Sequence, residues 1–271
     1  MLIGFLAIFL IVSCQEKREF KTYNKKAENL ECSSNFVNGI YYNGNFFLSS
    51  LNCTFVYSYN LKLIRSYGMS GSFFISNDSL FLISNDTLFY YKNDSFVKIG
   101  EFKNLLGYEN GYYIFKNMVV YRNDTFRINE IETYIKLANS LVIGTNGYGL
   151  YFIENRRLKR IMLGKIPSNF IKAIAIRGDS IIIGFSEPFS KSKVGFFKDK
   201  TIKVYEFSDD YITDIFSNGE VLLVGTTNGL FEYKNNEFSK VLDGYISKII
   251  HILKDSVYLI LNGEVKVLKT S

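Results

Sequence analysis

Short apolar runs alternate with polar turns along almost the whole chain. After a polar turn comes an intensely apolar strand, then a second turn, a strand rich in aromatic residues, a charged turn and a last strand ending in Ile or Val. The apolar strand returns about 28 to 40 residues apart along the chain. Its seven copies are Asn45–Leu48, Ser79–Ile83, Gly111–Phe115, Ser140–Gly144, Ser180–Gly184, Glu220–Gly225 and Ser256–Ile260. Helical periodicity is missing after residue 30, so the pattern predicts an all-β fold.

An aromatic hairpin repeats in step with the apolar strand. Its clearest copies begin at Leu88, Met118, Leu150, Val194 and Leu230, with a divergent copy at Thr54 and a truncated one at Gly263. A four-stranded unit repeated at this spacing predicts a β-propeller over residues 31–271. The count predicts seven blades, with six or eight still open. Blades that are apolar on both faces are stable only when they pack on one another around an axis.

The truncated last copy lacks its outer strand. An open sheet edge is a liability, so we expect another part of the chain to complete the last blade. The segment near 29–33 is predicted to supply this strand.

The amino terminus carries an apolar run of a different kind. Leu2–Val12 is too short to span a bilayer but has the length of a signal-peptide core. The tetrapeptide Ile11–Cys14 resembles the lipobox of bacterial lipoproteins, although no Lys or Arg precedes it. The resemblance implies export to the cell envelope, cleavage before Cys14 and acylation of that cysteine. We therefore expect a signal peptide at 1–13 and a polar tether over 14–30.

Two copies of the repeat carry a Gly-Thr motif at the end of the apolar strand. Leu141–Tyr151 and Leu222–Phe231 resemble the repeat of two-component regulator propellers, which form sensory periplasmic regions. The resemblance implies the same fold and compartment. This Gly-Thr motif places Gly144 and Gly225 at strand ends, where a missing Cβ allows close packing or a positive φ. No second hydrophobic segment follows, so we expect the lipid to be the sole anchor.

Composition excludes several classes of function. The net charge of +6 comes from scattered Lys and Arg, which argues against nucleic acid. The one histidine, His251, is expected in or near the core, and metal and cofactor sites are not predicted. Asn-Asp and Gly-Asp pairs before Ser or Thr are read as hairpin turns. Three of them, together with Lys254-Asp255-Ser256, precede a small aliphatic residue and also resemble the O-glycosylation acceptor of some Bacteroidota.

Candidate contact residues lie in loops. Propeller ligands usually meet the face that carries the loops entering each blade and the loops joining its middle strands. The longest middle loop holds Glu187, Phe189 and Lys191, and Asn146, Tyr148 and Asn228 are expected on the same face. Cys32 and Cys53, 21 residues apart, are a candidate disulfide in an exported protein.

These features favour a membrane-anchored, non-enzymatic binding module of the bacterial envelope. Its partner could be a protein, a glycan or a small molecule. The alternative is a structural or assembly subunit of an envelope or outer-membrane complex. An enzyme (lyase, glycosidase or quinone-dependent oxidoreductase) is disfavoured, because such propellers line the axis with several acids, histidines or metal ligands.

Overall fold

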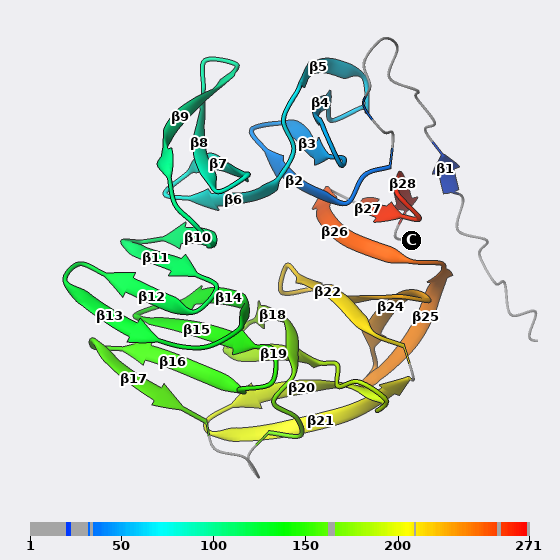
Figure 1. Cartoon of the computed structure of the whole chain (residues 1–271). Coiled ribbons are helices and arrows are strands. Elements are labelled where there is room, and N and C mark those ends of the chain that lie inside the picture. Colours follow the sequence, from blue (N-terminus) through cyan, green and yellow to red (C-terminus); the bar gives the residue numbers. More distant parts are fainter. Residues whose placement is uncertain are drawn as a thin grey trace, which may run out of the picture.

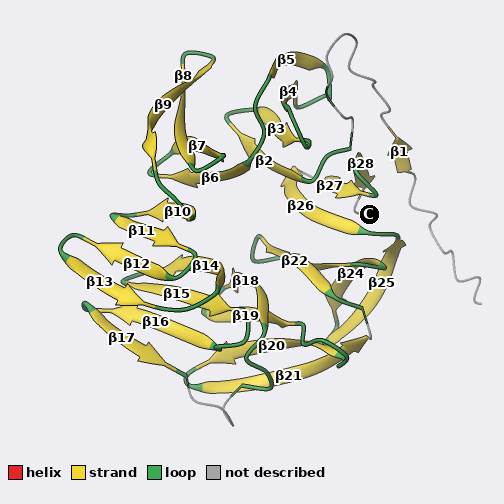
Figure 2. Cartoon of the chain, viewed as in Figure 1, coloured by secondary structure: helices red, strands yellow, loops and turns green. Residues whose placement is uncertain are grey.

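Seven four-stranded antiparallel sheets form a ring in the computed structural model of the chain (Figure 1). The structure describes residues 20–22, 32, 35–161, 166–208, 210–253 and 256–269. Figure 2 shows only strands and loops over this part of the chain. Accordingly, no helix long and apolar enough to cross a membrane occurs among the described residues. The fold is a seven-bladed β-propeller, as the repeat predicts.

Each blade is a meander whose first strand lies nearest the axis. The first blade contains β2 (Asn38–Tyr42), β3 (Asn45–Ser49), β4 (Thr54–Ser58) and β5 (Leu63–Tyr67). The second contains β6 (Ser72–Ser76), β7 (Ser79–Ser84), β8 (Thr87–Lys92) and β9 (Ser95–Glu101). The third contains β10 (Leu105–Glu109), β11 (Tyr112–Phe115), β12 (Met118–Tyr121) and β13 (Asp124–Arg127). The fourth contains β14 (Ile131–Leu137), β15 (Ser140–Thr145), β16 (Leu150–Glu154) and β17 (Arg157–Arg160).

The remaining blades continue the same order around the ring. The fifth contains β18 (Ile171–Arg177), β19 (Ser180–Phe185), β20 (Ser192–Lys198) and β21 (Thr201–Ser208). The sixth contains β22 (Ile212–Ser217), β23 (Leu222–Thr226), β24 (Gly229–Lys234) and β25 (Glu237–Asp243). The seventh contains β26 (Ile246–Leu253), β27 (Ser256–Leu261), β28 (Glu264–Lys269) and, from the amino-terminal part, β1 (Phe20–Thr22).

The ring closes through β1, which pairs antiparallel with β28. The register joins Phe20 to Leu268 and Thr22 to Lys266. An amino-terminal strand therefore completes the last blade, but the predicted location near 29–33 is wrong. The pairing strand lies about ten residues earlier, inside the segment predicted as a tether, where its three ladder pairs protect half of the six-residue edge of β28. Residues 1–19, with the predicted signal peptide and Cys14, lie outside the described part.

The polar pairs between strands are tight turns. Both central residues have positive φ at Asn77-Asp78, Asn85-Asp86 and Asn93-Asp94. Asn and Asp tolerate this conformation, which matches the twist of the flanking strands. The turn interpretation of these Asp-Ser and Asp-Thr motifs is confirmed at these three positions.

Glycines on the second strands allow neighbouring blades to approach closely. A Cβ at Gly144 would lie 2.4 Å from Ile171 Cγ2 of the fifth blade, and one at Gly225 would lie 2.8 Å from Ile246 Cγ2 of the seventh. Both isoleucines are almost fully buried and begin the innermost strand of the following blade. Close packing, not a positive φ, therefore explains these two glycines.

Candidate functional site

One face of the ring carries the loops that enter each blade and the loops between second and third strands. Successive antiparallel strands reverse direction, so these two kinds of loop lie at the same end of every blade. We call this the upper face. Among its described loops are 50–53, 68–71, 146–149, 186–191, 227–228 and 244–245.

All six predicted contact residues lie in upper-face loops of three consecutive blades. Asn146 and Tyr148 belong to the fourth blade, Asn228 belongs to the sixth, and the fifth supplies Glu187, Phe189 and Lys191. That they bind a ligand stays a prediction.

Hydrogen bonds hold the two short loops firmly. The Asn146 amide donates to the Glu130 carbonyl of the adjoining loop at 2.8 Å. The Thr145 hydroxyl donates to the Gly149 carbonyl at 2.7 Å and accepts from the Tyr148 amide at 3.1 Å. In the sixth blade, the Thr226 hydroxyl spans its turn in the same way, to the Gly229 carbonyl at 2.9 Å. The threonine of each Gly-Thr motif thus braces an upper-face turn through its hydroxyl group.

Exposed aromatic side chains gather on this face. Phe189, whose φ is +62°, is fully exposed at the tip of its loop. Tyr148, Tyr211 and Tyr245 are 41%, 39% and 45% exposed. We call these four residues the aromatic arc, because their loops follow one another from the fourth blade to the seventh. Large exposed apolar groups that share a surface commonly mark an interaction site.

Sequence reasoning missed Tyr211 and Tyr245. Each directly precedes the buried isoleucine that begins an innermost strand, and Phe170 holds the same repeat position before Ile171. Aligning the blades on that isoleucine would have revealed a recurrent aromatic at the upper face.

A β-bulge recurs at the upper end of the innermost strands of blades three to seven. Bulges re-aim side chains, and here each adds one residue near the mouth of the axis. The inserted residues are Leu106, Glu132, Lys172, Thr213 and Ser247.

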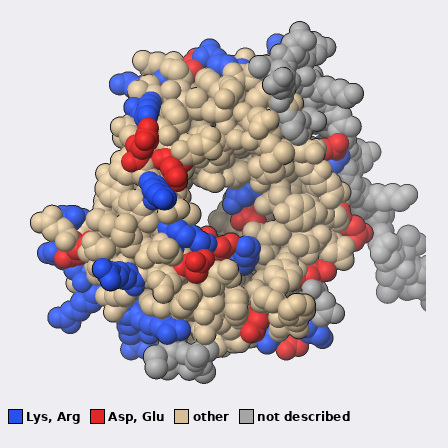
Figure 3. All heavy atoms as spheres, viewed as in Figure 1, with Lys and Arg blue, Asp and Glu red and all other residues tan. Residues whose placement is uncertain are grey.

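Ion pairs join neighbouring blades around this mouth. Lys116 of the third blade lies 3.1 Å from the Glu130 carboxylate, and Lys172 of the fifth pairs with Glu132 of the fourth. Lys248 of the seventh blade lies 3.0 Å from Asp214 of the sixth. Figure 3 shows acidic and basic side chains interleaved around the central opening. These charges link the blades and largely neutralise one another.

The acidic groups at the mouth are engaged in structural contacts. Asp214 accepts hydrogen bonds from the Lys248 ammonium and the Ile249 amide. Within the described ranges, no group of three or more His, Cys, Asp and Glu side chains is arranged to hold a metal ion.

His251 lies on innermost strand β26 and stacks on Tyr41 of the first blade. Their ring centroids are 4.5 Å apart, and the planes differ by 13°. Burial lowers the pKa of His251 below its ordinary value, since the apolar seam disfavours the imidazolium. The lowered pKa favours the neutral imidazole, which packs at the contact between the last blade and the first.

We expect stability to fall as the pH drops through about 6.5, where the histidine of the unfolded chain gains a proton that the folded chain resists. The folded pKa is the lower one, so this contribution is complete above the unfolded pKa and is lost below it. Urea unfolding at about pH 7.5 and 5.5 would measure the change. On going to the lower pH, His251→Phe should lose less free energy of unfolding than wild type. An equal loss in both proteins would contradict the assignment.

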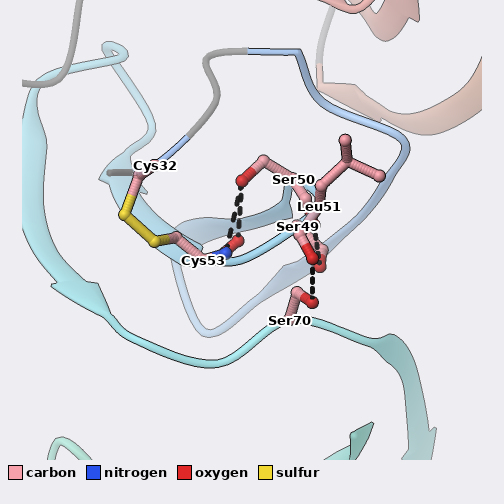
Figure 4. The surroundings of a disulfide bond; sticks show 6 residues. All are labelled: Cys32, Ser49, Ser50, Leu51, Cys53 and Ser70. Carbon is pink, nitrogen blue, oxygen red and sulfur yellow. Dashed lines mark hydrogen bonds between the residues drawn. A yellow bond between two sulfur atoms is a disulfide. The ribbon is translucent and has the colours of Figure 1, made fainter. Parts of the chain in front are cut away.

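Cys32 and Cys53 form a disulfide at the upper face, with their Cα atoms 5.7 Å apart. Figure 4 shows the bond beside the loop that joins β3 to β4. Cys53 is buried and closes this loop through a hydrogen bond from the Ser50 amide to its carbonyl at 2.8 Å. The disulfide thereby attaches the segment before the first blade to the upper-face loop of that blade.

Comparison with known proteins shows the fold. No protein-family model and no curated protein sequence matches the chain. The extracellular domain of BT4673 from B. thetaiotaomicron is similar with a TM-score of 0.69 at 14% identity over 93% of this chain. This chain spans only 40% of that one.

Two other similar structures are matched over their whole length. The β-propeller domain of Cps50 (Swd1) from Myceliophteria thermophila has a TM-score of 0.62 at 12% identity and is covered over 93% of this chain and 100% of that one. A chain of the mitotic checkpoint complex has a TM-score of 0.67 at 10% identity, with both chains fully covered. At these identities the likeness establishes the β-propeller fold.

Proposed function

We propose that this chain is an exported, lipid-anchored binding module that engages a protein partner through the aromatic arc, without catalysis. The observation that carries the proposal is the gathering of Tyr148, Phe189, Tyr211 and Tyr245 on one face. Tyrosine and phenylalanine are enriched in protein interfaces, where they bury much apolar area.

A protein fits this surface better than a small ligand does. The four aromatic residues come from upper-face loops of four consecutive blades, so a partner that contacts all of them must extend across four blades. Their loops are braced by backbone hydrogen bonds, for example from the Thr227 amide to the Tyr211 carbonyl at 2.9 Å and from the Asn262 amide to the Tyr245 carbonyl at 2.8 Å. A preordered surface loses little conformational entropy on binding.

Export and anchoring rest on the lipobox at Ile11–Cys14. The likeness to an extracellular domain of BT4673 and the disulfide between Cys32 and Cys53 support an oxidising compartment outside the cytoplasm. A cysteine carrying two or three acyl chains would hold the protein stably on a membrane.

Crosslinked capture from native membranes tests the proposal. Wild type should fractionate with membranes, and Cys14→Ser should be released from them. The double variant Tyr211→Ser/Tyr245→Ser should recover about tenfold less crosslinked partner than wild type, because Tyr is enriched among interface hot spots and a tenfold loss requires only about 1.4 kcal/mol from the pair.

Tyr59→Ser is the matched control. Tyr59 is 64% exposed in a turn on the opposite face, so its loss should leave the recovered partner unchanged. Equal recovery with the double variant and with wild type would refute binding through the aromatic arc. Membrane association of Cys14→Ser would refute the anchor.

A further inference from the structure

A polar pocket opens on the upper face where the seventh, first and second blades meet. Its volume is about 470 Å³, within the range of small-molecule sites. Its lining comes from four segments and is dominated by serine: Val37, Asn38, Ser49, Ser50, Leu51, Ser70, Gly71, Ser72, Ser247 and Lys248. The residues of the aromatic arc are not among those that line it.

The wall of the pocket is fixed before any ligand arrives. The Ser50 hydroxyl lies 3.2 Å from the Cys53 carbonyl and 3.3 Å from the Cys53 amide, and the disulfide locks Cys53 in turn. The Ser70 hydroxyl donates to the Leu51 carbonyl at 2.6 Å and ties the two loops together (Figure 4). The corresponding loops of the second and seventh blades are two-residue turns, Asn85-Asp86 and Asn262-Gly263, so this four-residue loop is a local elaboration.

Gly71 lets the loop that enters the second blade pack directly against β7 of the same blade. A Cβ there would lie 1.9 Å from the Ile83 carbonyl oxygen, so no other residue fits without a shift of the backbone. The Gly71 amide donates to the Ser49 hydroxyl at 2.9 Å, which holds both loops at the base of the pocket.

Several donors of the lining are left available. One N–H of the Lys248 ammonium bonds to Asp214, and two further N–H groups remain. Asn38 uses its side-chain oxygen to accept from the Gly39 amide, which leaves its NH₂ group. The Ser247 hydroxyl oxygen is buried and has no hydrogen-bond partner within the described part of the chain. A buried unsatisfied hydroxyl is unfavourable unless a bound group or water satisfies it.

We propose that this pocket binds a small hydroxylated carboxylate of the sugar-acid class. Lys248 would meet the carboxylate through a charge-assisted hydrogen bond, and Asn38, Ser72 and Ser247 would meet hydroxyl groups. Val37 and Leu51, which are 50% and 69% exposed at the pocket, offer apolar contact to the carbon skeleton.

The charge of the site favours a ligand with one negative charge over a ligand with two. Lys248 is already paired with Asp214, whose carboxylate disfavours a second anion nearby. A monocarboxylate therefore suits the pocket better than inorganic phosphate does.

Calorimetric titration of the purified full chain with glucuronate, glucose and inorganic phosphate tests this site. Glucuronate should bind with a Kd of about 1 mM or tighter, and glucose and phosphate at least about tenfold more weakly. Ser72→Phe should abolish binding by filling the pocket. Ser95→Phe is the matched control, because Ser95, like Ser72, is the exposed first residue of a strand but lies at the opposite face. The double variant Lys248→Met/Asp214→Asn removes the ion pair without leaving a lone carboxylate. It should weaken the binding of glucuronate about tenfold.

Four results would overturn the assignment: no binding of glucuronate, equal binding of glucose, tighter binding of phosphate, or unchanged binding by Ser72→Phe. The site is independent of the protein-binding proposal. Tyr211→Ser/Tyr245→Ser should bind glucuronate like wild type, so either proposal can fail alone.

Discussion

Gly144→Val is expected to lower the free energy of unfolding by about 3 kcal/mol. A side chain at this position would enter the contact between the fourth and fifth blades. Its Cβ alone would lie 2.4 Å from Ile171 Cγ2 and 2.8 Å from Thr133 Cγ2. Ile171 is 1% exposed and begins an innermost strand, so it has no open space into which to move. Overpacking here must shift one blade against its neighbour.

Equilibrium urea unfolding of both proteins would measure the effect. Gly68→Val is the control, since a Cβ at Gly68 meets no atom within 4 Å and its φ is not positive. That variant should stay close to wild type. Equal stability of Gly144→Val and Gly68→Val would show that the blades tolerate the extra volume.

Reduction of the disulfide is expected to cost about 3 kcal/mol of folding free energy, given the 21-residue separation of Cys32 and Cys53. The bond limits the freedom of the unfolded chain by closing this loop. In the folded protein it attaches the segment before β2 to the loop after β3. Its loss should therefore affect the first blade and the adjoining ring closure first.

Urea unfolding with and without reductant, together with thiol counting in denaturant, would test this expectation. Cys32→Ala/Cys53→Ala should match reduced wild type and should not respond to reductant. Two free thiols in the protein isolated from its native membrane would contradict the disulfide, and an unchanged midpoint on reduction would contradict its contribution to stability.

The fold was predictable because its determinants recur along the sequence. Seven copies of an apolar strand and an aromatic hairpin predict seven meanders, and the Asn-Asp pairs predict their turns. For Gly144 the sequence leaves close packing and a positive φ both open, and the structure shows close packing. Repetition makes each such signal readable several times.

Features that depend on one unrepeated contact were harder to predict. β1 pairs through only three residues, and nothing in the sequence of Phe20–Thr22 distinguishes them from other polar–apolar triplets. The pocket beside Ser50 and Ser247 joins segments almost 200 residues apart, which come together only when the ring closes. Tyr211 and Tyr245 follow a repeat position, yet their exposure depends on loop geometry.

The position of the closing strand β1 links membrane attachment of the chain to the closure of the ring. Six residue steps separate Cys14 from Phe20, a reach of at most about 20 Å. With Cys14 lipidated as proposed, β1 and the outer edge of the seventh blade stay close to the bilayer, and the opposite side of the ring faces away from it. A protease that cut between Thr22 and Cys32, before the disulfide to Cys53, would release the domain and separate it from its closing strand. Shedding from the membrane would then also expose the edge of β28, so the released form should be less stable than the attached one.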